Sequence, residues 1–283
     1  MIAEAFRLAA RSIIRNKLRS FLTILGIVIG VAAVIAMVTV GQGSSKQVSA
    51  SVEAMGADVL VLRPGRREFG PPGAGGRARP FTLRDAEALA HLPEVGALAP
   101  IATSSQTVIA GNANAATQIT GSTSGWLDVA NWTLASGRNF TGGEDNAGLA
   151  VCLLGPTVRQ RLFGEEDPVG QTVRIKSIAC QVVGVLAAKG AGSFGQDQDD
   201  IVVMPIRLLH RRLAGDTDGN TIQIKGAQGA SVQEATSAIQ QVMRERRRLS
   251  IEKDDDFSVT DMKEIATMLN SVNSVLSGLL SSV

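Results

Sequence analysis

A run of twenty uncharged residues near the N-terminus, Phe21 to Val40 (FLTILGIVIGVAAVIAMVTV), constrains this chain more than any other feature. At about 1.5 Å per residue, a helix of that length covers the roughly 30 Å hydrocarbon core of a bilayer. Such a helix also pairs its own backbone N–H and C=O groups, which lipid cannot do for it. The run therefore predicts a membrane-spanning helix at residues 21–40.

Two other interpretations of this run fit less well. A secretory signal peptide also begins with basic residues, but its apolar region is usually only about 7 to 15 residues long. A buried helix of a soluble protein would show a polar stripe, whereas this run contains only Thr23 and Thr39 as polar side chains. The membrane span is therefore preferred over both.

Charge predicts the orientation of the span. The first twenty residues contain one acidic residue, Glu4, and five cations: Arg7, Arg11, Arg15, Lys17 and Arg19. By the positive-inside rule, this end stays in the cytoplasm and the chain after Val40 emerges on the other face. Residues 1–20 are also predicted as an amphipathic helix lying on acidic membrane lipid, although a charged extension of the spanning helix is the alternative.

The emerged part is large and nearly neutral. About 240 residues follow the span, enough for one large or two ordinary domains. Near-neutral charge argues against nucleic acid as a partner. The two cysteines, Cys152 and Cys180, lie in apolar runs, so two separately buried thiols are favoured over a disulfide.

Two narrow apolar seams stand at opposite ends of the emerged part. Each has helical spacing: Val48, Val52 and Met55 in the first, and Ile265, Met268, Val272, Val275 and Leu279 in the second. Such seams predict two stalk helices that pair; the alternative is that each packs on its own domain. The second seam has no stop signal near Val283, which predicts that the polypeptide continues into the bilayer.

Between the seams, strand and helix patterns alternate. Strands are predicted at 59–62, 96–101, 106–109, 150–154, 172–175, 180–186, 201–204, 221–225 and 257–260, and helices at 82–91, 156–163, 206–213 and 232–247. This order predicts an α+β fold in which a β-rich subdomain is inserted into a βαββ…βαβ subdomain. The expected divisions are 1–20, 21–40, 41–111, 112–219 (the insertion), 220–260 and 261–283.

Signatures of catalysis are absent from the sequence. His91 and His210 stand apart from cysteines and carboxylate pairs, so solvated or capping roles are favoured over metal ligation. The acidic runs at 197–200 and 254–256 lack the spacing of a calcium loop and are interpreted as solvated loops. No phosphate-binding loop or nucleophile elbow occurs. The sequence therefore predicts no catalytic, metal or cofactor site.

Two features indicate partners instead. A Gly/Pro-rich loop at 64–80 carries Arg66, Arg67, Arg77 and Arg79, which predicts either a solubilising edge or a docking site for an acidic partner. Gly26 and Gly30 form a Gly-x-x-x-Gly step in the predicted span. Small residues at that spacing let a second membrane helix approach closely.

Several strings taken together resemble one family, the MacB-type, FtsX-like permease subunits of ABC transporters. The strings are RSIIRNKLRSFLTILGIVIGVAAVIAM at 11–37, MGADVLVLRPG at 55–65, FTLRDAEAL at 81–89, LFGEEDPVGQTVRI at 162–175, VVGVLAAKG at 182–190 and DDDFSV at 254–259. Their order and spacing carry the resemblance over essentially the whole chain.

The resemblance implies a fold and a role. Family members have four membrane helices and an extracytoplasmic domain made of Porter and Sabre subdomains, and they dimerise. A cytoplasmic ATPase, expected here as a separate polypeptide, drives motion outside the membrane. A periplasmic adaptor (membrane fusion protein) and an outer-membrane channel complete the path in Gram-negative exporters.

The sequence is therefore interpreted as the permease subunit of an ABC exporter in the bacterial inner membrane, without an activity of its own. Its expected partners are the ATPase, a second copy or a paralogous permease, the adaptor and channel, and membrane lipid. A single-pass sensor or adaptor with an extracytoplasmic ligand domain is the alternative, and a membrane-anchored hydrolase fits least. The transported substrate is not readable from the residues.

Overall fold

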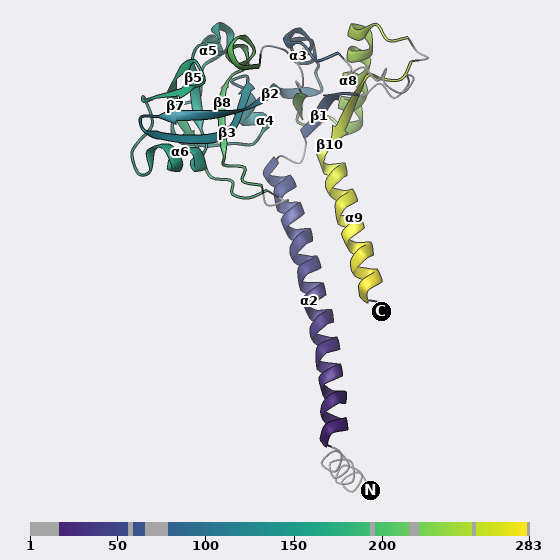
Figure 1. The fold of residues 1–283 in the computed structure, drawn as a ribbon. Helices are drawn as coiled ribbons and strands as arrows, with labels where there is room; N and C mark the ends of the chain where they lie inside the picture. The colour runs from purple at the N-terminus through teal and green to yellow at the C-terminus, as the bar shows by residue number, and fades with distance from the viewer. Residues whose placement is uncertain are drawn as a thin grey trace, which may run out of the picture. The chain divides into compact units, whose positions relative to one another are not determined.

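The computed structural model describes residues 17–55, 59–65, 79–192, 196–214, 221–250 and 253–281. The chain divides into two compact units, one made of residues 1–49 with 267–283 and the other of residues 50–266. The larger unit is a mixture of helices and strands, drawn with its element labels in Figure 1. The predicted helix at 1–16 lies outside the described residues.

The N-terminal helix α2 is a single helix from Lys17 to Met55. Its segment Lys17–Gly41 is long and apolar enough to cross a membrane, and none of it is buried within the chain. The predicted span at 21–40 lies inside this segment, and the helix continues without interruption through Gly41. The second long helix, α9, runs from Met262 to Ser281.

One part of the larger unit is an open antiparallel sheet. Its strands, in spatial order, are β10 (Phe257–Asp261), β1 (Val59–Pro64), β9 (Thr221–Gly226) and the first half of β2 (Val95–Ala110). Helices α3 (Leu83–Leu89) and α8 (Val232–Arg247) pack on one face of this sheet and bury a common apolar core. Both helices begin with a capping box, at Thr82 and Ser231 respectively, which fixes where each starts.

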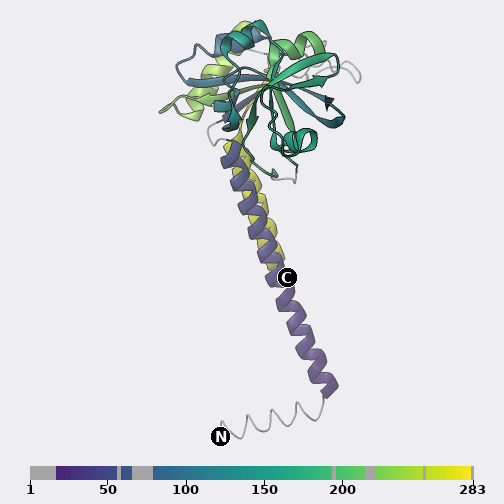
Figure 2. The same ribbon diagram turned by 90° about the vertical axis from the view of Figure 1, so that its left-hand side faces the viewer.

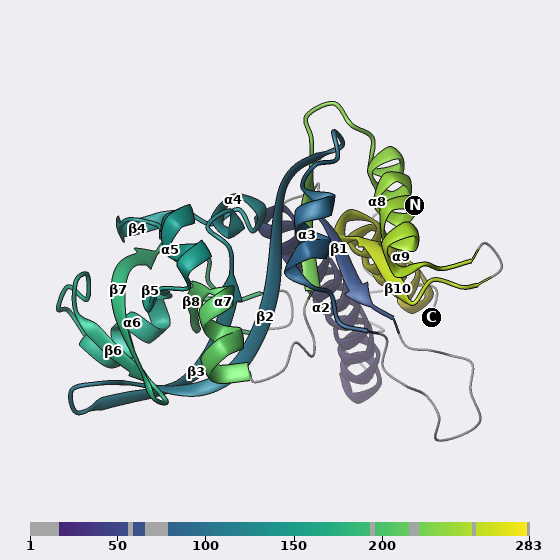
Figure 3. The ribbon, with the colours of Figure 1, turned by 90° about the horizontal axis from the view of Figure 1, so that it is seen from above.

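Strand β2 links this sheet to the rest of the unit, as Figure 3 shows from above. Its first half pairs with β9, and its second half pairs with β3 (Ala113–Ser122). The prediction of two strands, 96–101 and 106–109, was wrong. The polar residues Thr103–Ser105 looked like a break, but they pair in register with Gln118–Thr120 of β3.

The remaining strands close on themselves. The pairing path β2-β3-β8-β5-β7 returns to β2 through β6, which pairs with both β7 and β2; Figure 2 views these strands from the side. Their bounds are Val151–Leu154 (β5), Thr172–Ile175 (β6), Ile178–Leu186 (β7) and Ile201–Pro205 (β8). This closed sheet encloses a core of buried side chains that includes Val108, Ile119, Cys152, Val173 and Met204. Closure leaves few free edges in this part of the unit.

Helices and one further strand surround the closed sheet. They are α4 (Trp126–Val129), β4 (Leu134–Gly137), α5 (Gly142–Ala147), α6 (Pro156–Phe163), α7 (Ile206–Leu209) and a π-helical turn η1 (His210–Ala214). The predicted bounds of α6 are confirmed, whereas the predicted helix 206–213 is divided between α7 and η1. The sequence prediction missed β3, α4, β4 and α5. Helices α4 and α5 and strand β4 have only four to six residues, and β3 is rich in small and polar residues, so these elements give little periodic signal.

Candidate functional site

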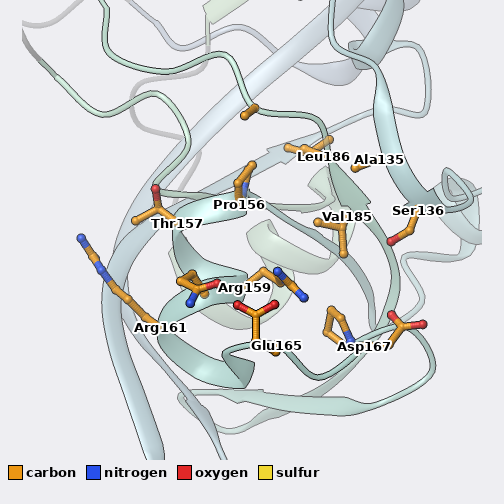
Figure 4. Close-up of a pocket in the computed structure, with 13 residues that line it drawn as sticks. Ala135, Ser136, Pro156, Thr157, Arg159, Arg161, Glu165, Asp167, Val185 and Leu186 are labelled. Atoms are coloured by element: carbon orange, nitrogen blue, oxygen red, sulfur yellow. The ribbon is translucent and has the colours of Figure 1, made fainter.

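An open cleft lies beside the start of α6, at the end of the closed sheet (Figure 4). Strands β5 and β7 are parallel, so their carboxyl ends meet at one side of the sheet. Helix α6 follows β5 directly and β4 pairs with the end of β7, so the two elements border this point from opposite sides. The cleft has a volume of about 840 Å³.

The cleft has an apolar floor and a charged rim. Its floor includes the buried residues Val185 and Leu186 at the end of β7. Arg159, Glu165 and Asp167 belong to the rim; Figure 4 shows Arg159 extending across the cleft and Glu165 facing it from below. Among the described side chains, neither Arg159 nor Glu165 forms an ion pair. Arg161 points away from the cleft in Figure 4 and forms an ion pair with Asp200.

The wall at the start of α6 is tightly packed. Gly155 is the N-cap residue of α6, and a Cβ added there would lie 2.1 Å from the carbonyl oxygen of Asp199. The Thr157 hydroxyl donates to the Asp197 carboxylate at 2.7 Å. Only glycine allows the strand-to-helix turn to approach this segment so closely.

The acidic run at 197–200 is solvated only in part, because Asp199 has a structural role. This corrects the interpretation of the run as a solvated loop. Asp199 is only 7% exposed. Its carboxylate accepts hydrogen bonds from the backbone N–H groups of Lys189 and Gly190, at 2.8 and 3.1 Å. The run looked like a surface loop because three carboxylates in a short segment are usually solvated. Backbone donors from a neighbouring segment satisfy Asp199 instead.

Lys189 ties the same wall to α4. Its ammonium group donates to the Ala130 carbonyl at 2.6 Å and lies 4.7 Å from the ring centre of Trp132. Burial lowers the pKa of Lys189 to about 8, against the opposing attraction of Asp199. Trp132 in turn stacks on Trp126, with ring centres 6.1 Å apart. Leu186, a floor residue of the cleft, belongs to the same buried cluster as both tryptophans.

The structure does not test whether the two predicted seams pair with each other. On α9, Ile265, Met268, Val272 and Val275 are between 39% and 65% exposed. The side chains of Val48, Val52, Met55 and Leu279 lie outside the described ones. The pairing of two stalk helices stays a prediction.

The two glycines of the predicted span face open space. A Cβ added at Gly26 or Gly30 would meet no atom within 4 Å. The chain therefore has room at this face for the backbone of another helix. Whether such a helix packs there stays a prediction.

The arginine loop is described only at its two ends. Arg66, Arg67 and Arg77 lie outside the described residues, and Arg79 is exposed. The Gly65 N–H donates to the Asp256 carbonyl at 2.8 Å, and the Arg247 guanidinium donates to the Arg79 carbonyl at 2.7 Å. Since Arg247 also pairs with the Asp256 carboxylate at 2.7 Å, both ends of the loop are held at one place.

The two cysteines are free and fully buried, as predicted. They lie on the neighbouring strands β5 and β7, and the pKa of the Cys152 thiol is raised well above its ordinary value by its hydrogen bond with Cys180 and by burial. His91 is exposed and His210 is half-buried. Among the described residues, no group of three or more His, Cys, Asp or Glu side chains could hold a metal ion.

Comparison with known families decides the family of this chain. The family model described as "MacB-like periplasmic core domain" matches residues 20–242. This chain belongs to the MacB-like periplasmic core domain family. The match includes most of α2, the open sheet up to α8, and the whole closed sheet.

Relatives support the same family. The macrolide export ATP-binding/permease protein MacB of Rhodospirillum rubrum is 35% identical over 282 residues, covering 99% of this chain and 42% of the relative. The pyoverdine export ATP-binding/permease protein PvdT of Pseudomonas entomophila is 35% identical over 246 residues, covering 87% of this chain and 37% of the relative. The chain thus spans less than half the length of these curated relatives.

A solved structure shows the same fold. The periplasmic region of MacB from Actinobacillus actinomycetemcomitans superposes with a TM-score of 0.63 at 18% identity, covering 77% of this chain and 95% of that structure. The chain is therefore a member of the MacB-type ABC exporter permease family, with a candidate membrane span and a periplasmic core domain.

The cleft beside α6 was not predicted from the sequence. The string LLGPT at 153–157 was a usable signal, since an apolar strand followed by Gly-Pro predicts a sharp turn into a helix. The opposite wall was not predictable in this way, because β4 is a strand of only four residues, LASG. Because β4 was not predicted, the second wall of the cleft could not be expected.

Proposed function

We propose that this chain is the permease subunit of a MacB-type ABC exporter, which carries ATP-driven motion from a cytoplasmic ATPase to its periplasmic domain. The observation that carries the proposal is the family match over residues 20–242, which joins the candidate span to the periplasmic core domain. Motion transmission is the finer part of the proposal, and it rests on the long helices.

Helix α2 is suited to transmit displacement. It contains 39 residues, which at about 1.5 Å each gives a length near 60 Å, roughly twice a bilayer core. A continuous helix keeps its backbone hydrogen bonds along its whole length, so it moves as a stiff element. Helix α9 offers a second one, and its exposed apolar seam is free to take a partner.

The proposed surroundings follow from the family. The protein lies in a bacterial inner membrane. Its N-terminus is on the cytoplasmic side, and the domain after Val40 is on the periplasmic side. The partners are the ATPase, a second copy or paralogous permease, lipid, and in a Gram-negative envelope an adaptor and outer-membrane channel. The relatives named for macrolide and pyoverdine export support efflux of an antibiotic, peptide or lipid-linked molecule.

The division into subdomains is also part of the proposal. The open sheet, with α3 and α8, would be the Porter-like subdomain, and the closed sheet the inserted Sabre-like subdomain. Separate hydrophobic cores beneath α3 and α8 and inside the closed sheet support this division. A third buried cluster contains Ala99 of β2 together with Leu153 and Val203 of the closed sheet. The shared strand β2 would couple them mechanically.

Cysteine crosslinking tests the transmission. Val48→Cys and Val272→Cys place thiols on the two seams in full-length protein assembled with its ATPase. We expect the crosslinking yield to differ between ATP-bound and nucleotide-free states, because two narrow seams suit two alternative packings. Cys152 and Cys180 are fully buried, and a background lacking both serves as the control.

The outcomes separate the candidates. Equal crosslinking in both states, with ATPase binding demonstrated in the same sample, would remove the mechanical role. A protein that binds no ATPase at all would instead favour the single-pass sensor.

A further inference from the structure

A second, smaller pocket shares no lining residue with the cleft beside α6. It is lined by residues of α3, β2, α5 and α7 and has a volume of about 210 Å³. A cavity of about 150 Å³ with apolar walls holds a benzene molecule, whereas drug-sized ligands need about 300 Å³ or more. The pocket therefore has room for a ligand built on a single ring. Its apolar walls come from Leu83, Ala86, Ala90, Leu98, Pro100 and Ile206.

The pocket also contains a buried carboxylate, that of Asp145 on α5. Asp145 lines the pocket and is only 8% exposed. Its Oδ2 accepts a hydrogen bond from the Ser124 backbone N–H at 3.3 Å, but among the described residues its Oδ1 has no hydrogen-bond partner. Such an unpaired buried oxygen is unfavourable. Either oxygen can turn toward the pocket, because the terminal torsion of an aspartate is only weakly fixed.

The other charged residues of the pocket do not compensate Asp145. Arg207 and Glu87 also line it, and they face each other with 3.8 Å between Nη2 and Oε1. Together they are neutral, so the negative charge of Asp145 is left over. Burial raises the pKa of Asp145, in spite of the Ser124 N–H and the attraction of Arg207. These two contacts therefore favour the charged carboxylate less than burial disfavours it.

The missing partner of Asp145 is a cation that donates hydrogen bonds. A neutral ligand would leave the carboxylate charge unpaired, and an anion would be repelled by it. An ammonium group supplies both the positive charge and the N–H donors, and such charge-assisted hydrogen bonds are roughly twice as strong as neutral ones. The apolar walls require that the rest of the ligand be apolar.

We propose that this pocket binds a small organic ammonium ion, whose cationic group donates to Asp145 and whose apolar body packs against Leu98 and Ile206. The pocket joins α3 and β2, which belong to the open sheet, to α5 and α7 beside the closed sheet. This site goes beyond the exporter role, and its test needs no transport measurement.

The test compares 4-fluorobenzylamine with 4-fluorobenzyl alcohol, which have the same ring and differ in the ammonium and hydroxyl groups. Fluorine NMR measures the affinity of each for the full chain in lipid nanodiscs. Empty nanodiscs measure the partitioning of each compound into lipid, which is subtracted. We expect the unsubstituted protein to bind the amine at least tenfold more tightly than the alcohol.

Asp145→Asn removes the charge and keeps the shape of the side chain and an acceptor for the Ser124 N–H. We expect at least tenfold weaker binding of the amine and unchanged binding of the alcohol. The matched control is Asp128→Asn, which removes an exposed carboxylate of α4 outside the pocket. It should leave the affinity for the amine unchanged.

A second variant fills the pocket without touching the buried carboxylate. Ala90 is exposed and lines the pocket, so Ala90→Phe should weaken the binding of the amine at least tenfold. Ala179→Phe adds the same ring at an exposed position of β7 outside the pocket and should have no effect. The fluorescence of Trp126 and Trp132 verifies that each variant is folded, since the chain has two tryptophans and no tyrosine.

Three results would overturn the proposal. They are equal affinities of the unsubstituted protein for the amine and the alcohol, full affinity of Asp145→Asn for the amine, and full affinity of Ala90→Phe for it. Should the fluorescence show that Asp145→Asn is misfolded, the comparison of the two compounds and the Ala90→Phe variant still decide the question.

Discussion

Arg138, just after β4, forms a two-pronged ion pair with Glu144 of α5. Its two terminal nitrogens lie 2.8 Å from the two carboxylate oxygens of Glu144. Glu144 also accepts a hydrogen bond from the Thr141 backbone N–H at 2.7 Å and completes the capping box of α5. Arg138, and then the Thr141 donor, lower the pKa of Glu144 from 4.5 to about 2.

This pair predicts a pH dependence of stability. Because the folded pKa lies below the unfolded value, the stabilisation is complete above about pH 4.5 and is lost as the pH falls through about 2. In Arg138→Ala we expect the pKa of Glu144 to rise toward 4.5, with a smaller acid dependence of the unfolding free energy. Carboxyl carbon NMR shifts and denaturant titrations measure the two quantities.

The matched control is Arg174→Ala, an exposed arginine on β6. It should leave the Glu144 titration unchanged. A Glu144 pKa that stays near 2 in Arg138→Ala would show that the Thr141 hydrogen bond alone lowers it.

Among the elements, α8 anchors the open sheet through the arginines of its last turns. The Arg247 guanidinium lies 4.6 Å from the Phe81 ring centre and 6.0 Å from that of Phe257, and it pairs with Asp256. Its side chain is only 9% exposed. Arg247 therefore holds α8, β10 and the segment before α3 together.

Arg247→Ala is expected to destabilise the domain by about 3 kcal/mol, because it leaves the Asp256 carboxylate without its cation in a poorly solvated place. Urea unfolding of the variant and of the unsubstituted protein measures this loss.

The neighbouring residue is the control for this prediction. Arg246 pairs with Asp85 at 2.8 Å but is 34% exposed, so Arg246→Ala should cost less than about 1 kcal/mol. Equal losses in the two variants would contradict the anchoring role of Arg247.

A second prediction about an element concerns the face of α2 that carries Gly26 and Gly30. Gly30→Leu is expected to reduce dimer yield and export while the periplasmic domain stays folded, because leucine would hold a partner backbone away. Among the described residues, no atom outside the backbone of the same helix lies within 4 Å of an added Cβ, so we attribute such a loss to a partner helix. Val28→Leu, elsewhere on the helix, is the control, and wild-type dimerisation of Gly30→Leu would show that the glycine face contacts lipid.

For the whole molecule, the proposed partner outside the membrane is an adaptor. We expect the full chain in nanodiscs to bind it with an affinity that falls as salt rises, if the arginine loop contributes. Replacing Arg66, Arg67, Arg77 and Arg79 with Ser should weaken binding and flatten the salt dependence. Surface plasmon resonance at two salt concentrations measures both, and unchanged binding would exclude the loop from the interface.

Local signals explain most of the successful predictions. Helices α3, α6 and α8 carry cap residues at their starts, namely Thr82, Gly155-Pro156 and Ser231, so their first residues were predictable. Strands β5, β7 and β8 are mainly apolar runs, and β6 (TVRI) alternates exposed and buried residues. By contrast, β3 (ANAATQITGS) consists mostly of small and polar residues, and its strand character comes from pairing with β2 and β8. Pairing is a contact between distant segments and leaves little local pattern.

The sequence by itself determined the candidate span, the α+β character and the family, because uncharged length, capping pairs and ordered strings are local properties of the chain. Only the tertiary structure decided that β2 is one strand shared by two sheets, that six strands close, and that Asp199 is buried. The cleft also depends on it, since its walls β4 and α6 become neighbours only through pairing with β7 and β5. Such features depend on which distant backbone groups find partners, and that is decided only when the chain folds.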